Sequence, residues 1–252
     1  MPKVIALSSG KGGSGKSFVT ANLAIAFSKF GRRVLMVDAD LPMPNLNMFA
    51  GLKEMPVTLY DVLARKKPVE SAVYKVYGGA DIMPCGTSLE SFLKADIRRI
   101  KNVIDAVRKI YEYVLVDTSS GLNKYNLNVL KVSDEVIWVV NPDEPSMSDT
   151  LRLKTAADIF NVKTRGMIVN KVPSFSWSER RKAPKVKKSD LEAKLGCGVL
   201  GVIPESSQVK VATLVQKSVI EYSPKGPVTK AFRELARVLL TQDSGVSLPQ
   251  KA

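Results

Sequence analysis

Residues 10 to 17 read Gly10-Lys11-Gly12-Gly13-Ser14-Gly15-Lys16-Ser17, and they indicate the fold of the whole chain. The stretch fits the pattern G-x-x-x-x-G-K-[ST] of a phosphate-binding loop, or P-loop. An apolar run of strand type, residues 4–7, precedes it, and residues 18–30 carry apolar side chains at helical spacing. In such a strand–loop–helix unit, glycines allow backbone N–H groups to surround phosphate oxygens at the helix N-terminus.

Each part of this loop has an expected contact with a nucleotide. Lys16 should reach the β- and γ-phosphates, and the Ser17 hydroxyl should bind Mg²⁺. A glycine turn before an ordinary helix would not need this Lys-Ser pair. The predicted nucleotide-binding residues of the stretch are Gly10, Lys11, Gly12, Gly13, Ser14, Gly15, Lys16, Ser17 and Phe18.

Aspartates follow two further predicted strands. Asp38 and Asp40 come after the run 33–37, and Asp117 ends the buried run 113–117. Open α/β sheets bind ligands at the carboxyl ends of their strands, so these carboxylates should lie near the P-loop. The second run has the Walker B form, in which Asp117 would hold Mg²⁺ through water.

Lys11 makes the loop resemble the deviant Walker A sequence, K-G-G-x-G-K-[ST], of the MinD/ParA family of ATPases. Three other segments support this resemblance: Asp38-Ala39-Asp40 with Asn45-Leu46 is similar to the family's switch I, Asn141-Pro142 to its T-N-P segment, and residues 200–205 to G-V-I-P-E-D. The resemblance extends from residue 3 to about residue 240 and is closest to MinD, in particular its shorter archaeal-type members.

The resemblance implies a role for each matching residue. Lys11 would reach the nucleotide of a second subunit, Asp38 would support the Mg²⁺ shell, and Asp40 would orient or deprotonate the attacking water. The Gly121 N–H would meet the γ-phosphate, Asn170 would recognise adenine, and the loop of Pro204 and Glu205 would pass the base. The predicted catalytic residues are therefore Lys11, Lys16 and Asp40, and the predicted metal site is Ser17, Asp38 and Asp117.

The switch II segment departs from the family pattern. It reads Thr118-Ser119-Ser120-Gly121, with Ser119 where the family usually has proline. A missing proline leaves a loop with more conformations to restrict, so we expect this loop to be less preorganised. That expectation concerns the rate of hydrolysis more than ATP binding.

Composition limits the other possibilities. The 252 residues suit one α/β domain, 1–241, followed by a polar tail, 242–252. The chain has no histidine, which excludes His-based triads, and Cys85 and Cys197 lack the paired spacing of a metal or iron–sulfur site. No signal-peptide pattern precedes the first strand, so we expect a protein of the cytoplasm or of the periphery of the membrane or nucleoid.

The remaining patterns predict a doubly wound, mostly parallel sheet flanked by helices. Further strands are expected at 80–83, 135–140, 165–169 and 200–205, and helices at 58–63, 96–111, 146–160 and 227–240. In the helix 96–111 one apolar face is predicted to pack in the core; it consists of Ile97, Ile100, Val103, Ile104, Val107 and Ile110.

The net charge is +14, and one dense cluster contributes to it: Arg180, Arg181, Lys182, Lys185, Lys187 and Lys188. Beside Phe175 and Trp177, this cluster suits DNA or an anionic membrane surface, or it is a solvated loop. Gly245 and Pro249 argue against the terminal amphipathic helix with which MinD proteins bind membranes.

Two functions remain open at this stage. The first is a slow, Mg²⁺-dependent ATPase that binds ATP or ADP, dimerises with ATP, and acts as a switch in spatial organisation of the cell with an unidentified protein regulator. The second is a ParA-like partition ATPase that binds DNA non-specifically through a basic surface.

Overall fold

The computed structural model describes residues 2–173 and 187–245. Eight strands form one sheet in the order β3-β4-β2-β5-β1-β6-β7-β8, and only the short edge strand β3 pairs antiparallel. The strands are β1 (Lys3–Ser8), β2 (Val34–Ala39), β3 (Tyr74–Lys75), β4 (Asp81–Met83), β5 (Tyr113–Thr118), β6 (Glu135–Val140), β7 (Lys163–Val172) and β8 (Val199–Pro204). This arrangement confirms the predicted doubly wound, mostly parallel fold.

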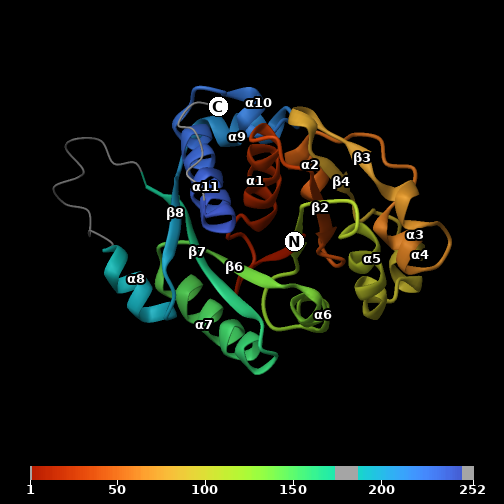
Figure 1. The fold of residues 1–252 in the computed structure, drawn as a ribbon, viewed down its shortest axis with the longest axis horizontal. Helices are drawn as coiled ribbons and strands as arrows, with labels where there is room; N and C mark the ends of the chain where they lie inside the picture. Colours follow the sequence, from red (N-terminus) through yellow and green to blue (C-terminus); the bar gives the residue numbers. More distant parts are fainter. Residues whose placement is uncertain (1, 174–186, 246–252) are drawn as a thin grey trace.

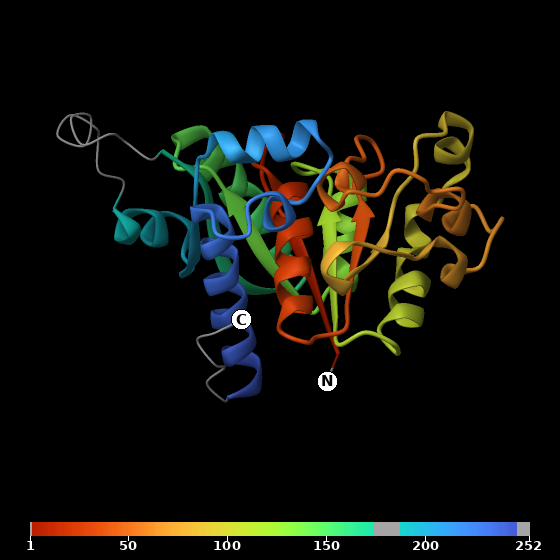
Figure 2. The same cartoon turned by 90° about the horizontal axis from the view of Figure 1, so that it is seen from above.

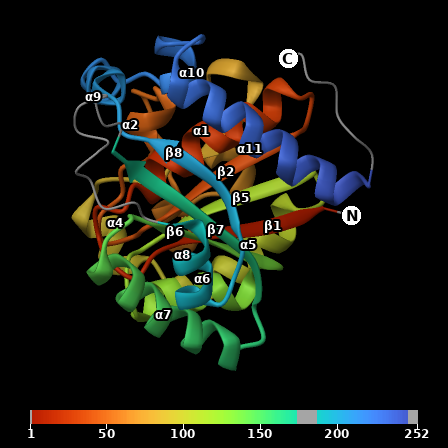
Figure 3. The same cartoon turned by 90° about the vertical axis from the view of Figure 1, so that its left-hand side faces the viewer.

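Helices cover both faces of the sheet (Figures 1 and 3). They are α1 (Lys16–Lys29), α2 (Leu46–Ala50), α3 (Leu59–Leu63), α4 (Leu89–Lys94), α5 (Ile100–Val107), α6 (Lys124–Val132), α7 (Glu144–Ile159), α8 (Lys188–Leu195), α9 (Ser207–Leu214), α10 (Val219–Tyr222) and α11 (Pro227–Ser244). Single turns of 3-10 helix, η1 (Val69–Ala72), η2 (Tyr77–Gly79) and η3 (Ile97–Arg99), complete the described chain.

Two apolar cores lie on opposite faces of the sheet because strand side chains alternate. Ile5 and Leu7 of β1 pack in the core that contains α1 and α11. Val4 and Ala6 of the same strand pack in the core that contains α5, α6 and α7. The central strands are buried on both faces, as expected of a parallel sheet enclosed by helices.

This topology brings the predicted site together. β1 lies between β5 and β6, and the P-loop connects β1 to α1. Asp38 at the end of β2 is the register partner of Asp117 at the end of β5, and Asp117 is also the partner of Leu7 in β1. The carboxylates and the P-loop therefore share the carboxyl edge of the sheet.

The predicted helix 96–111 is wrong at both ends. The chain forms η3 first and the regular α5 ends at Val107, because it must turn there to enter β5. Ile110 lies past this end and is about half exposed, at 48%, so it is not part of the core face. Near residue 58 the prediction is confirmed, since Thr58 and Asp61 form a capping box at the start of α3.

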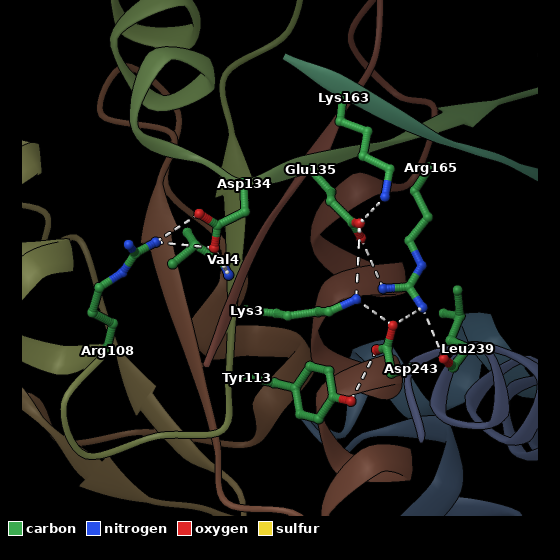
Figure 4. Close-up of polar contacts among 10 residues, drawn as sticks. All are labelled: Lys3, Val4, Arg108, Tyr113, Asp134, Glu135, Lys163, Arg165, Leu239 and Asp243. Atoms are coloured by element: carbon green, nitrogen blue, oxygen red, sulfur yellow. Dashed lines mark hydrogen bonds and ion pairs between the residues drawn. The ribbon is translucent and has the colours of Figure 1, made fainter. Parts of the chain in front are cut away.

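The last helix is longer than predicted. α11 continues past residue 240 to Ser244 and stops at Gly245, which has a left-handed φ of 64°. Residues 242–244, counted in the predicted polar tail, are helical. Asp243 in this last turn joins a partly buried polar cluster, called the ionic cluster below, that consists of Lys3, Tyr113, Glu135, Lys163, Arg165 and Asp243 (Figure 4).

That ionic cluster fixes α11 to the amino ends of four strands. Asp243 pairs with Lys3 of β1 and with Arg165 of β7 (2.8 Å), and it accepts a hydrogen bond from the Tyr113 hydroxyl of β5 (2.9 Å). Arg165 also pairs with Glu135 of β6 at 2.9 Å and donates to the Leu239 carbonyl. Among the described helices, none is long and apolar enough to cross a membrane.

Candidate functional site

The P-loop is held by close backbone contacts that only glycine permits. Gly13 and Gly15 have left-handed φ values of 78° and 92°. A Cβ on Gly10 would lie 2.1 Å from the Asp149 carbonyl carbon and 2.2 Å from the Thr150 nitrogen of α7. The Gly10 N–H donates to the Thr150 hydroxyl (3.1 Å), so α7 supports the start of the loop.

Lys16 and Ser17 begin α1 and are both buried. The Lys16 ammonium group donates to the Ser120 hydroxyl at 2.7 Å, which links the P-loop to switch II. Sequence reasoning gave Ser120 no role, because hydroxyl residues are common in loops. In this structure it holds the lysine that is predicted to bind phosphate.

Three carboxylates cluster beside these residues. Asp38 accepts hydrogen bonds from the N–H groups of Leu46 (3.0 Å) and Asp40 (3.2 Å), but burial and the neighbouring Asp117 raise its pKa. Burial also raises the pKa of Asp40, although the Lys16 charge opposes this shift. Two carboxylates this close disfavour simultaneous ionisation unless a cation lies nearby.

Asp117 has the fewest hydrogen-bond partners of the three carboxylates. Burial raises its pKa to about 7, against the opposing effects of the Lys16 charge and the Ser17 hydroxyl. Neither carboxylate oxygen has a hydrogen-bond partner of good geometry among the described residues. Hard oxygen donors in this arrangement, the Ser17 hydroxyl with two aspartates, fit Mg²⁺, which favours carboxylate and hydroxyl ligands and retains several waters.

Lys11 points to a different partner from Lys16. Its ammonium group pairs with Asp143 at 2.9 Å, and the side chains of Lys11 and Asp143 are 32% and 41% exposed. Asp143 is also the N-cap of α7, since its carboxylate accepts from the Ser146 N–H at 2.8 Å. Burial raises the pKa of Asp143, but the hydrogen bonds from Lys11 and Ser146 outweigh this effect and hold the pKa below its usual value.

A cavity of about 710 Å³ opens next to the loop, a size typical of small-ligand sites. It is lined by Gly12, Gly13, Gly15, Lys16, Ser17, Phe18, Pro42, Met43, Asn45, Phe49, Ser119, Ser120, Asn123, Asn170, Lys171, Pro204, Glu205, Ser206, Val209 and Lys210. Lys11, which belongs to the part of the chain that the structure describes, does not line this cavity.

The predicted base-binding residues lie on one side of this cavity. Asn170 ends the buried part of β7 and its amide nitrogen donates to the Ser14 carbonyl at 2.8 Å. Gly15 is needed here, because a Cβ would lie 2.2 Å from that amide nitrogen. Lys171, which sequence reasoning missed, has a left-handed φ of 55° and donates to the Gly13 carbonyl at 2.7 Å.

Side chains of Asn123, the N-cap of α6, and of Asn126 within α6 form hydrogen bonds with switch II. The Asn123 side chain accepts from the Ser119 hydroxyl (2.9 Å) and donates to the Ser120 carbonyl (2.8 Å). Asn126 donates to the Gly121 carbonyl (2.9 Å). These hydrogen bonds restrain the loop around Ser119. The expectation of lower preorganisation without proline stays a prediction.

Gly121 differs from its expected role in one respect. Its N–H donates to the Ser9 carbonyl at 2.9 Å, so in this structure it is not directed at a phosphate. Ligand binding would have to exchange this hydrogen bond. Of the basic cluster 180–188, only Lys187 and Lys188 belong to the described residues; Arg180, Arg181, Lys182 and Lys185 lie outside them, as do Phe175 and Trp177.

Comparisons with known proteins agree with this geometry. A family model described as an AAA domain matches residues 2–166. A relative described as an uncharacterised ATP-binding protein of Methanocaldococcus jannaschii is 35% identical over all of this chain and 92% of its own length. The septum site-determining protein MinD of Pyrococcus horikoshii, solved with Mg-ADP, is 31% identical with a TM-score of 0.88, over 97% of this chain and 98% of its own. The chain belongs to the MinD/ParA family of P-loop ATPases.

Two further matches fall within the same family group. MinD of Aquifex aeolicus, solved as a MinC:MinD cell division complex, has a TM-score of 0.84 and 28% identity over 99% of both chains. A model of 4Fe-4S iron–sulfur cluster binding proteins of the NifH/frxC family matches residues 147–251. The matched residues contain a single cysteine, Cys197, and so lack the paired cysteine spacing expected of an iron–sulfur site.

Proposed function

We propose that this protein is an Mg²⁺-dependent ATPase that dimerises when ATP is bound and acts as a molecular switch. The observation that carries the proposal is the separation of its two loop lysines. Lys16 lies in the nucleotide cavity and contacts switch II, whereas Lys11 lies outside the cavity and pairs with the exposed Asp143. A lysine in that position is available to a facing subunit.

The residues of the site have distinct proposed roles. Lys16 and the loop N–H groups bind the β- and γ-phosphates, and Ser17, Asp38 and Asp117 hold Mg²⁺, which when bound neutralises phosphate charge. Asp40, whose raised pKa makes it a better proton acceptor, orients or deprotonates the attacking water. Asn170, Pro204 and Glu205 contact the base, and Gly121 turns its N–H toward the γ-phosphate once its bond to Ser9 is exchanged.

Hydrolysis should be slow for a single subunit. The transition state gains charge on its oxygens, and the cation that stabilises this charge is Lys11 of the other subunit. The monomer therefore lacks one catalytic group until it dimerises. The lifetime of the dimer then sets the duration of the signal.

The cellular role follows from the family. Its members named MinD act in septum placement or cell division, and one is solved in complex with MinC. We infer that this protein positions a partner in the cell, from the cytoplasm or the periphery of the membrane, and that a protein regulator reads its dimeric state. Which regulator it is depends on surfaces that the dimer creates.

Two variants test the dimer switch. Lys11→Ala should bind ATP, because Lys16, Ser17 and the loop backbone remain, but it should stay monomeric and inactive. Asp40→Ala should bind ATP and accumulate as a dimer that does not turn over. Light scattering with ATP and Mg²⁺, together with phosphate release, gives both readouts. If Lys11→Ala dimerises and hydrolyses ATP at the normal rate, the proposal is wrong.

A second candidate function rests on charge. The net charge of +14 and the basic cluster 180–188 suit a ParA-like partition ATPase that binds DNA. DNA binding by the ATP-bound form that weakens steeply with salt would favour this function. Binding of anionic vesicles without DNA binding would favour the membrane role instead.

A further inference from the structure

A second pocket, which has no lining residue in common with the nucleotide cavity, lies beside α3 and α5. These two helices lie at one end of the molecule (Figures 1 and 2). It is a pocket of about 450 Å³ between the C-terminal end of α3, the segment that follows it, and the first turns of η3 and α5. Its lining residues are Val62, Arg65, Lys66, Lys67, Pro68, Val69, Arg99, Asn102 and Val103. Four of these are cationic, and none of these described lining residues is acidic.

The cations of this pocket are only weakly neutralised. Lys66 reaches Glu90 at 3.8 Å and Arg99 reaches Asp96 at 4.0 Å, both at the limit of an ion pair. The side chains of Arg65 and Lys67 have no ion pair or hydrogen bond with any residue in 2–173 or 187–245. Four positive charges thus face one pocket with little compensation, which favours an anionic ligand.

Arg65 occupies a backbone position that disfavours it. The last turn of α3 ends in a Schellman motif: the Lys66 N–H donates to the Asp61 carbonyl (2.8 Å) and the Arg65 N–H to the Val62 carbonyl (3.0 Å). Arg65 stands at the left-handed position of this motif, with φ 60°, where glycine is usual. Asn161, Lys171 and Gln216 have the same left-handed backbone, so Arg65 differs from Asn161 and Gln216 by its place in a cationic pocket and not by its backbone alone.

The Arg99 side chain is fixed by a hydrogen bond to the same end of α3. Its guanidinium donates to the Leu63 carbonyl at 2.9 Å, one of the unpaired carbonyls of the last turn of α3, and its side chain is 30% exposed. A cation fixed before binding loses less conformational freedom when a ligand arrives. Asn102, one helical turn away on α5, adds neutral hydrogen-bonding groups to the same wall.

From these observations we propose that this pocket binds a small molecule with clustered phosphate groups, at a site separate from the nucleotide cavity. Arginine and lysine side chains that line one pocket match closely spaced phosphates. A long nucleic acid fits less well, since the lining has valine and proline but no aromatic side chain for base stacking.

Titration calorimetry with inorganic pyrophosphate tests this site. The protein is first loaded with Mg-ADP, so that the P-loop is occupied, and is then titrated in low salt. The wild type should bind pyrophosphate, and Arg65→Gly and Lys67→Gln should each raise the Kd about tenfold or more. Glycine suits the backbone at position 65, so the first variant should keep its fold and its melting temperature.

Matched controls separate the pocket from general effects. Asn161→Gly removes a side chain from the same backbone conformation (φ 56°) elsewhere, and Lys101→Gln removes one positive charge from an exposed ion pair on α5. Both should bind pyrophosphate like the wild type. The proposal is overturned if the wild type binds none after ADP loading, or if Arg65→Gly and Lys67→Gln bind as tightly as the wild type. Duplex DNA binding that these two variants weaken, without pyrophosphate binding, would overturn it in favour of a nucleic-acid surface.

Discussion

The Lys11–Asp143 ion pair predicts that removing one carboxylate will strengthen dimerisation. In the proposed dimer Lys11 must leave Asp143 to reach the other subunit, so this pair stabilises the monomer. Asp143→Asn removes the charge but keeps the cap on Ser146, because Asn and Asp cap helices about equally well. α7 should therefore remain intact in the variant.

The structure sets the size of this effect. Both side chains are about one-third exposed or more, at 32% and 41%, and pairs of this kind contribute about 0.2–1 kcal/mol. Two such pairs break for each dimer, so the change is about 0.4–2 kcal/mol, equivalent to a dimer Kd about 2- to 30-fold lower. The difference should shrink at high salt, since exposed charges are screened.

Sedimentation velocity with a non-hydrolysable ATP analogue and Mg²⁺ measures the dimer Kd directly. Glu144→Gln is the matched control: it removes the next carboxylate of the same helix end, which pairs with Lys194 rather than with Lys11. Its Kd should equal that of the wild type. If Asp143→Asn dimerises no better than Glu144→Gln, or less well than the wild type, Asp143 does not retain Lys11 in the monomer.

Three other predictions follow from contacts described above. Lys16→Ala should abolish ATP binding in calorimetry, because the loop loses its main charge on the β- and γ-phosphates; unchanged affinity would refute the P-loop assignment. Gly10→Ala should weaken ATP binding at least tenfold without unfolding the protein, since a Cβ 2.1 Å from the Asp149 carbonyl carbon forces the loop away from α7; a normal Kd would show that the loop can shift freely. Asp243→Asn should lower the free energy of unfolding by about 2 kcal/mol at pH 7, because Lys3 and the buried Arg165 lose a partner while Glu135 still compensates them. The pKa of Asp243 is lowered by Lys3 and Arg165 against the effect of burial, so this contribution is complete above about pH 4, the range of a free Asp, and is lost as the pH falls through the lowered pKa. The difference between the melting temperatures of the two proteins should therefore shrink as the pH falls below about 4, and a difference that does not change with pH would contradict this account.

The central part of the fold was predictable because its signals are local. The glycine loop, the apolar strand runs and the aspartates at their ends each specify an element by a few neighbouring residues, and parallel packing then brings them to one edge. The capping box of Thr58 and Asp61 was predictable for the same reason. Helical periodicity alone did not reveal where α5 stops, because that end depends on the path into β5.

Contacts between distant segments were not predictable. Nothing near Ser120 in the sequence indicates that it holds Lys16, and nothing near Asp143 indicates that it pairs with Lys11. Ser119 stands where the family usually has proline, and nothing in the sequence indicates that Asn123 and Asn126 form hydrogen bonds with this loop through their side chains. Such side-chain contacts become visible only when the loop is folded.

The ionic cluster at the base of the sheet has a consequence for biosynthesis. Lys3 and Arg165 precede Asp243 in the chain by 240 and 78 residues. The N-terminal parts of a chain are made first, so a sheet that forms during synthesis carries both cations with Glu135 as their shared carboxylate until Asp243 has been made. The docking of α11 then supplies the second carboxylate, so this contact follows the formation of the sheet.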